Sequence, residues 1–236
     1  MSTTEAVWAV VPAAGIGSRM GADIPKQYLQ LNNKALLQHT LERLASHPRI
    51  TGIVVALADN DPWWPALKLS LDCKLLLTKG GETRSDSVSN ALETLAEETD
   101  DNPWLLVHDA ARPCIRHSDI DRMLLQLSEH GVGGILGVPV TDTVKRVDDK
   151  GVIVETVDRH GLWRAGTPQM FRLKLLQQAL SSAAEQGHVV TDEASAIELM
   201  GLHPMMVEGH QDNIKVTLPQ DLALASLYLE QQSRGQ

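Results

Sequence analysis

Cysteine is scarce in this chain of 236 residues, which contains only Cys73 and Cys114. The two do not form a CxxC pair, so the sequence does not indicate a structural zinc site. The N-terminal segment MSTTEAVWAV has no basic residues ahead of its apolar ones, so we expect no signal peptide. These features together predict a cytoplasmic protein, in which both cysteines would be reduced thiols rather than a disulfide.

Long apolar runs and an excess of basic residues are also missing. No apolar run approaches the ~18 residues that a membrane-spanning helix needs, so we expect no membrane partner. Acidic residues outnumber basic ones by 30 to 21, and the formal net charge is −9. A surface with this charge repels nucleic acid, so we expect no nucleic-acid partner. Any anionic substrate must then be held by a local cluster of cations.

What the sequence does contain is a regular alternation of short apolar runs and helical patterns. This alternation predicts an α/β protein with one mostly parallel sheet and helices on both faces, in a single domain over residues 1–236. The expected strands are Val7–Ala13, Gly52–Ala58, Lys74–Thr78, Trp104–His108, Ile135–Val140 and Asn213–Thr217. The expected helices are Lys34–Ser46, Thr83–Glu98, one that opens at Ser118, Arg172–Gln186, Asp192–Met200 and Gln220–Gln231.

Polar residues at three of these helix starts are candidates for caps. Thr83 with Asp86 has the spacing of a capping box, and Ser118 with Asp121 repeats that spacing. Thr191 is a candidate N-cap of the helix that follows it. In each case a side-chain oxygen would accept from backbone N–H groups that the first helical turn leaves without partners.

The segment after Val140 departs from the alternation. Two strand-like pieces, Thr143–Val147 and Val152–Val157, flank the turn signal DDKG. They predict a hairpin at about 141–160 that leaves the domain as an arm. An isolated two-stranded hairpin is only marginally stable in water, so we expect the arm to pack against a second copy of the chain in a two-fold dimer.

A glycine-rich stretch, PAAGIGSRMGADIPKQ, follows the first expected strand. It lacks the Walker A pattern, which disfavours a P-loop kinase or GTPase. Gly15 and Gly17 begin a dinucleotide fingerprint, but a methionine stands at its third glycine and the acidic residue expected ~20 residues on is misplaced, so an NAD-dependent oxidoreductase is a weak alternative. A glycine-rich turn without a ligand is another. Arg19 and Lys26 favour an anion-binding loop, since a proline stiffens the chain just before the lysine.

This stretch resembles the signature of sugar-nucleotide pyrophosphorylases, and six later motifs narrow the resemblance. They are GGETRSDSV, VHDAARP, TVDRHGLW, TPQ, TDEAS and NIKVT, in this order. Together the motifs resemble the 2-C-methyl-D-erythritol 4-phosphate cytidylyltransferase family over roughly Trp8 to Tyr228. The resemblance implies a Rossmann-like fold, CTP and methylerythritol phosphate as substrates, Mg²⁺ as cofactor and a homodimer with exchanged arms.

The resemblance also implies roles for individual residues. The catalytic cations would be Arg19, Lys26, Arg159 and Lys215. The CTP-binding residues would be Pro12, Ala13, Ala14, Gly15, Gly17, Gly80, Gly81, Glu82, Arg84 and Ser87. The acceptor-binding residues would be Asp109, Ala110, Arg112, Thr143, Thr167 and Thr191. Asp109 would also be a ligand of Mg²⁺, which commonly uses one carboxylate together with phosphates.

The reaction that the resemblance implies is limited by electrostatic repulsion. The nucleophile is a phosphate monoester, which is largely ionised at pH 7 and needs no general base. Its charge must approach a triphosphate, and two like charges ~4 Å apart repel by about 4 kcal/mol at an effective dielectric constant of 20. Fixed cations, with magnesium, should therefore dominate catalysis.

Simpler explanations exist for several of these residues. Arg84 and Ser87 can belong to an ordinary solvated first helical turn, and Asp109 can cap the segment after it. Arg159 can be a surface cation paired with Asp142 or Asp158. His108 carries no assigned chemistry and is expected to be a packing residue.

Two other functions remain open at this point. A ribitol 5-phosphate cytidylyltransferase would share the loop and the CTP pocket. A catalytically silent nucleotide-binding module would not need the acceptor-side residues.

Overall fold

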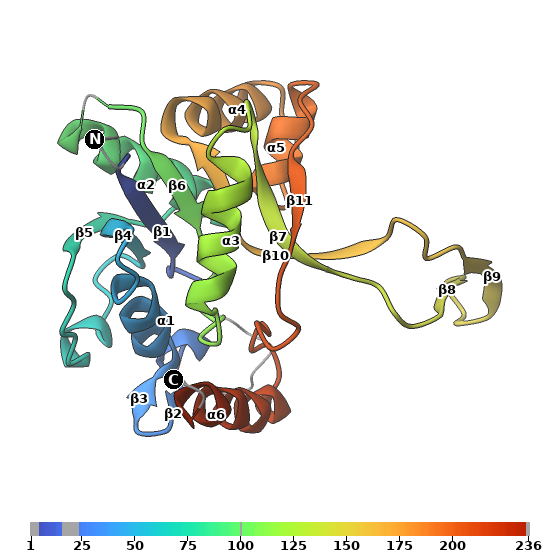
Figure 1. The fold of residues 1–236 in the computed structure, drawn as a ribbon, viewed down its shortest axis with the longest axis horizontal. Coiled ribbons are helices and arrows are strands. Elements are labelled where there is room, and N and C mark those ends of the chain that lie inside the picture. Colours follow the sequence, from blue (N-terminus) through green and yellow to red (C-terminus); the bar gives the residue numbers. More distant parts are fainter. Residues whose placement is uncertain (1–4, 16–23, 100, 235–236) are drawn as a thin grey trace.

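The computed structural model describes residues 5–15, 24–99 and 101–234. Its centre is a seven-stranded sheet with the strand order β11-β7-β10-β6-β1-β4-β5 (Figure 1). β10 runs antiparallel to both of its neighbours, and the other neighbouring strands are parallel. The prediction of one mostly parallel sheet is confirmed. The strands are β1 (Val7–Pro12), β4 (Ile50–Leu57), β5 (Lys74–Lys79), β6 (Trp104–Val107), β7 (Gly133–Pro139), β10 (Trp163–Arg172) and β11 (Met205–Glu208).

Helices cover both faces of this sheet, as the alternation predicts (Figure 1). Val7, Ala9 and Val11 of β1 pack into one core with α1 and α3, whereas Trp8 and Val10 pack into a second core with α2, α4 and α5. Strands buried on both faces are apolar at successive positions, which explains the continuous apolar run of β1. The helices are α1 (Leu36–Ala45), α2 (Arg84–Glu98), α3 (His117–Leu127), α4 (Leu173–Glu185), α5 (Glu193–Leu199) and α6 (Pro219–Arg234).

Short elements complete the fold. The segment after the glycine-rich stretch contains the 3-10 turn η2 (Lys26–Tyr28) and a small hairpin of β2 (Gln30–Leu31) and β3 (Lys34–Ala35). A second 3-10 turn, η3 (Trp64–Ala66), lies between β4 and β5. None of the helices in the described part of the chain is both long and apolar enough to span a membrane. Both cysteines are free thiols, as expected.

The helix caps were predicted correctly in one of three cases. Thr83 and Asp86 form the capping box at the start of α2. The prediction for Ser118 is wrong, because α3 begins one residue earlier and the N–H of Asp119 already bonds to Arg116 O at 3.1 Å. Thr191 is also not the cap of α5.

The cap of α5 is the next residue, Asp192. Its carboxylate accepts from the N–H of Ser195, and the Ser195 side chain in turn accepts from the Asp192 N–H. Thr191 lies just outside this box and is exposed.

The C-terminal strand lies elsewhere than predicted. Asn213–Thr217 is not a strand. Among its described backbone–backbone hydrogen bonds, only that of Val216 N–H to Ala111 O (2.9 Å) reaches a distant segment, so no ladder forms. The edge strand is β11, which precedes it. The sequence patterns also missed β10, because Gly166 and Pro168 interrupt its apolar character and the ladder with β7 is irregular between Ala165 and Gln169.

The arm is present as a hairpin of β8 (Val144–Val147) and β9 (Ile153–Val157). Its turn closes where Gly151 N–H bonds to Asp148 O at 3.0 Å, with Gly151 at a φ of +79°. Figure 1 shows the arm projecting well away from the sheet. Its apolar side chains are exposed and include Val147, Val152, Ile153 and Val154.

Candidate active site

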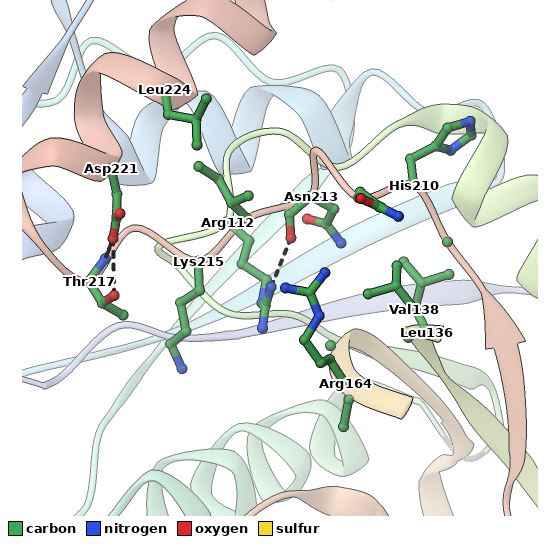
Figure 2. Close-up of a pocket in the computed structure, with 16 residues that line it drawn as sticks. Arg112, Leu136, Val138, Arg164, His210, Asn213, Lys215, Thr217, Asp221 and Leu224 are labelled. Carbon is green, nitrogen blue, oxygen red and sulfur yellow. Dashed lines mark hydrogen bonds between the residues drawn. The ribbon is translucent and has the colours of Figure 1, made fainter. Parts of the chain in front are cut away.

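Two cavities meet near the carboxyl ends of β1 and β6, the edge at which open α/β sheets bind ligands. The first, called here the loop cavity, has a volume of about 450 Å³. The second, the β10 cavity, has a volume of about 410 Å³ and is drawn in Figure 2. Lys215 lines both. The predicted site residues that line the loop cavity are Pro12, Ala13, Ala14, Gly15, Lys26, Gly81, Glu82, Arg84, Ser87, Asp109, Ala110 and Lys215.

The backbone at the start of the glycine-rich stretch is held in place from beneath. Ala13 N–H bonds to Ala56 O at 2.8 Å, which continues the pairing of β1 beyond its last residue. The Gln27 amide donates to Ala13 O at 2.7 Å and to Gly15 O at 3.0 Å. Gln27 is buried, and sequence reasoning missed it although it follows Lys26 directly. Gly17 and Arg19 lie outside the described residues.

The opposite wall is the turn between β5 and α2, where two glycines allow a close approach. A Cβ on Gly80 would lie 2.2 Å from the Cβ of Ala14, so this position touches the first wall. A Cβ on Gly81 would lie 2.2 Å from the Cβ of Asp86. Gly80 therefore sets the distance between the two walls rather than lining the cavity itself.

Ser87 braces this turn. Its hydroxyl accepts from Gly81 N–H and donates to Thr83 O, both at 3.0 Å. The side chain is buried, so Ser87 is not part of a solvated first turn. Its contribution to the loop cavity is to fix the turn that forms the wall.

Arg84 is also held within the protein. Its guanidinium bonds to both carboxylate oxygens of Glu193, at 2.5 and 3.1 Å, and its Nε donates to Asp109 at 3.3 Å. Burial alone would lower the pKa of Arg84, but the two carboxylates outweigh burial and raise it. Glu193 is buried and was not predicted, although it lies within the TDEAS motif beside Thr191.

Asp109 lies at the centre of a cation cluster. Such a cluster is what a protein of negative net charge needs in order to hold an anionic substrate. Its Oδ1 accepts from Arg84, and its Oδ2 contacts Arg112 Nε at 3.3 Å and Lys215 Nζ at 2.9 Å. Burial would raise the pKa of Asp109, but the three cations hold it well below its usual range. Asp109 is therefore an ionised carboxylate whose two oxygens are both engaged.

A chain of hydrogen bonds fixes the backbone around Asp109. Burial lowers the pKa of His108 to about 4, so the ring is neutral near pH 7. Its Nε2 lies 3.0 Å from Arg112 O and must donate to it, which leaves Nδ1 to accept from the Thr167 hydroxyl at 3.1 Å. The same hydroxyl accepts from Asp109 N–H at 3.1 Å. The Thr167 hydroxyl thus donates and accepts inside the protein. His108, which was expected only to pack, also holds the backbone of Asp109 in place through Thr167.

Arg112 extends the cluster into the β10 cavity. Figure 2 shows its bond to the backbone oxygen of Asn213, which measures 2.8 Å. The Asn213 amide donates to Thr167 O at 2.8 Å, which ties this segment to β10. Lys215 follows two residues later and reaches Asp109, so NIKVT contributes to the site although it is not a strand.

The remaining predicted residues do not line either cavity within the described part of this chain. Thr143 and Arg159 lie at the two ends of the arm. Arg159 donates to Thr141 O rather than pairing with Asp142 or Asp158. Thr191 is exposed at the start of α5, with its hydroxyl 3.5 Å from that of Ser195.

Comparisons with known proteins agree with one another. A family model described as 2-C-methyl-D-erythritol 4-phosphate cytidylyltransferase (IspD) matches residues 7–231. The relative of that name from Vibrio atlanticus (strain LGP32) is 53% identical over 232 residues, which cover 98% of this chain and 99% of the relative. The one from Haemophilus influenzae (strain 86-028NP) is 53% identical over 226 residues, which cover 96% of this chain and 97% of the relative.

Solved structures give the same result. The crystal structure of the Francisella tularensis protein of that name has a TM-score of 0.81 at 40% sequence identity, with 94% of this chain and 99% of that chain covered. A crystal structure described as 4-diphosphocytidyl-2C-methyl-D-erythritol synthase has a TM-score of 0.82 at 36% identity, with 95% and 98% covered.

Proposed function

This chain belongs to the 2-C-methyl-D-erythritol 4-phosphate cytidylyltransferase family, and from that membership we propose that its two cavities serve one reaction. The protein transfers a cytidylyl group from CTP to 2-C-methyl-D-erythritol 4-phosphate in isoprenoid biosynthesis. The products are 4-diphosphocytidyl-2-C-methyl-D-erythritol and pyrophosphate. The observation that carries the assignment to this site is the cluster of Arg84, Arg112 and Lys215 around Asp109, where the cavities meet.

We assign CTP to the loop cavity. Its walls include backbone from two glycine-containing segments, Pro12–Gly15 and the residues around Gly81, which can approach a base and phosphates closely. Gly80 brings these walls into contact, so the space between them suits a pyrimidine better than a purine. Lys26 lines the same cavity, and Arg19 belongs to the same stretch of chain.

The acceptor then reacts from the side of Lys215. Its phosphate oxygen is the nucleophile, so no side chain has to remove a proton. The fixed cations lower the repulsion between the acceptor phosphate and the triphosphate, and they stabilise the charge that develops on transfer. Because Asp109 and the His108–Thr167 chain hold these cations before substrates bind, little reorganisation is needed during the reaction.

The donor set does not fit Asp109 as a direct metal ligand, since three cations contact its two oxygens. His, Cys, Asp and Glu do not gather in any metal-binding group of three within the described residues. We therefore propose that Mg²⁺ enters bound to the phosphates of CTP, which is a common mode for this ion.

We propose a homodimer in which each arm reaches the partner's site. The arm exposes four apolar side chains, including Val152, Ile153 and Val154, and an isolated hairpin is only marginally stable. Thr143 and Arg159 lie where the arm leaves the domain, so each would act in the partner's acceptor pocket. We propose a cytoplasmic location, since CTP and a sugar phosphate are charged metabolites of that compartment.

Pyrophosphate release from CTP tests the proposed function. We expect release with methylerythritol phosphate, little with ribitol 5-phosphate, and a requirement for Mg²⁺. CTP should be preferred to ATP and GTP. A protein that binds CTP but releases no pyrophosphate with either acceptor would instead be a nucleotide-binding module.

A further inference from the structure

Three side chains with permanent positive charge line the β10 cavity: Arg112, Arg164 and Lys215. The one carboxylate among the lining residues is that of Asp221. It accepts from Thr217 N–H at 2.8 Å and from the Thr217 hydroxyl at 3.0 Å, so it is committed to the start of α6 (Figure 2). The cavity therefore has an excess of positive charge in a chain whose net charge is −9.

Arg164 differs from the other two cations. Arg112 and Lys215 each contact Asp109, whereas the Arg164 side chain makes no hydrogen bond or ion pair with any residue in the described part of the chain. Figure 2 shows its guanidinium pointing toward that of Arg112. Two cations that face one another repel, and an anion bound between them would remove that repulsion.

Strand β10 explains how Arg164 comes to this place. The residue pairs with Val138 of β7, ahead of the irregular stretch between Ala165 and Gln169. Within that stretch the same strand carries Thr167, whose hydroxyl accepts from Asp109 N–H. One strand thus brings Arg164 to the β10 cavity and supports Asp109 at the border with the loop cavity.

We propose that Arg164 is a further acceptor-binding residue, whose guanidinium holds the phosphate group of the acceptor together with Arg112 and Lys215. This inference rests on the proposed function. The acceptor phosphate must approach CTP in the loop cavity, and Lys215 marks the border between the cavities. A planar guanidinium can donate to two phosphate oxygens at once. A cavity of about 410 Å³ leaves space beyond the phosphate for a small polyol.

Steady-state kinetics of three variants test this inference. In Arg164→Gln we expect the KM for the acceptor to rise by about tenfold or more, which is about 1.4 kcal/mol. In Arg164→Lys, which keeps the charge but loses the planar guanidinium, the KM for the acceptor should rise less. The KM for CTP and the melting temperature should not change, because Arg164 is exposed and outside the loop cavity. Arg234→Gln, at the exposed end of α6, is the matched control and should behave as wild type.

Inorganic phosphate shows which part of the acceptor Arg164 contacts. At saturating CTP it should compete with the acceptor, and its inhibition constant should rise in Arg164→Gln by the same factor as the KM. Three results in Arg164→Gln would each overturn the inference: an unchanged KM for the acceptor, an equal rise in the KM for CTP, or an unchanged inhibition constant for phosphate. The proposed function would still stand in these cases, provided that the wild-type protein turns over. A wild-type protein without turnover would overturn both.

Discussion

Lys26 and Lys215 approach the loop cavity from opposite ends of the chain, and both would face the triphosphate. Their charges matter only if they are fixed before the reaction begins, because charge that must move into place stabilises a transition state less. Asp109 fixes Lys215 at 2.9 Å. The backbone of Lys26 is fixed by η2, which follows a proline that restricts the chain.

Removal of either predicted phosphate-binding cation should therefore affect turnover rather than folding. We expect Lys26→Ala and Arg19→Ala each to reduce kcat by at least ~10²-fold, the usual loss for a preorganised charge. Melting temperatures should stay within the range of wild type. Near-normal kcat in a folded variant of either kind would show that the glycine-rich loop does not hold the triphosphate.

Glu193 offers a test of a residue that the sequence patterns did not single out. Glu193→Gln removes one of the two carboxylates that hold the half-buried Arg84 and leaves Asp109 as the other, and loss of one partner of a buried ion pair costs about 3 kcal/mol of unfolding free energy. We expect a lower urea midpoint and a higher KM for CTP, because Arg84 lines the loop cavity. Glu230→Gln removes an exposed carboxylate and should change neither quantity. Equal behaviour of the two variants would contradict a structural role for Glu193.

At the scale of elements, the hydrogen bond between His108, which follows β6, and Thr167 of β10 links these two strands. Because this bond requires a neutral His108 ring, its contribution to folding stability depends on pH. Burial lowers the pKa of His108 to about 4, while in the unfolded chain it is about 6.5. Between these values the unfolded state binds a proton that the folded state does not. Stability therefore rises with pH across this window and is lost as the pH falls.

The expected slope from His108 is up to about 1.4 kcal/mol per pH unit between pH 6.5 and 4. Denaturant unfolding at half-unit steps measures it, and NMR titration of the ring assigns it. His47 and His39 also have a pKa lowered by burial and add to the slope. A His108 ring that titrates near pH 6.5 in the folded protein would contradict this explanation.

Elements built on local patterns could be predicted from the sequence, and those set by tertiary contacts could not. The apolar runs of β1, β4 and β6 and the box at Thr83 are local, and each was found within a few residues. β10 was missed because its glycine and proline suit a bulge that only the neighbouring strands reveal. The Asn213–Thr217 segment has a strand-like composition, but its polar side chains bond to Thr167 and Asp109 instead.

The candidate site divides in the same way. Most of the residues that the motifs singled out line one cavity, including Arg84, Asp109 and Lys215. Gln27 and Glu193 were missed because a buried amide and a buried carboxylate have no periodic signature of their own. The function of Glu193 depends on Arg84, which lies 109 positions before it, and that of Gln27 depends on the backbone oxygens of Ala13 and Gly15.

At the scale of the whole molecule, the arm makes the assembly testable. Lys26→Ala and Arg159→Ala would each be inactive alone and would be refolded together in equal amounts. If Arg159 acts in the partner's site, half of the dimers are mixed and each of these has one intact site. We then expect activity to return to about a quarter of wild type for random pairing of two-fold dimers.

The control for this experiment is a sample shown by mass spectrometry to contain mixed dimers. If Arg159 acts within its own chain, every site keeps one lesion and activity does not return. A mixed-dimer sample without activity would therefore contradict reciprocal arms. A monomer at working concentration would contradict the dimer itself.

Asp109 gives the protein a resident counter-ion. Its negative charge holds three mutually repelling side chains together in the absence of any substrate and offsets their repulsion in the folded state. At Arg112 and Lys215 an incoming phosphate meets cations that already have a partner, whereas Arg164 has none within the described residues. A phosphate carries more charge than a carboxylate, so it gains more from these two cations than a singly charged anion does. A single aspartate thereby weakens the attraction of Arg112 and Lys215 for small, singly charged anions.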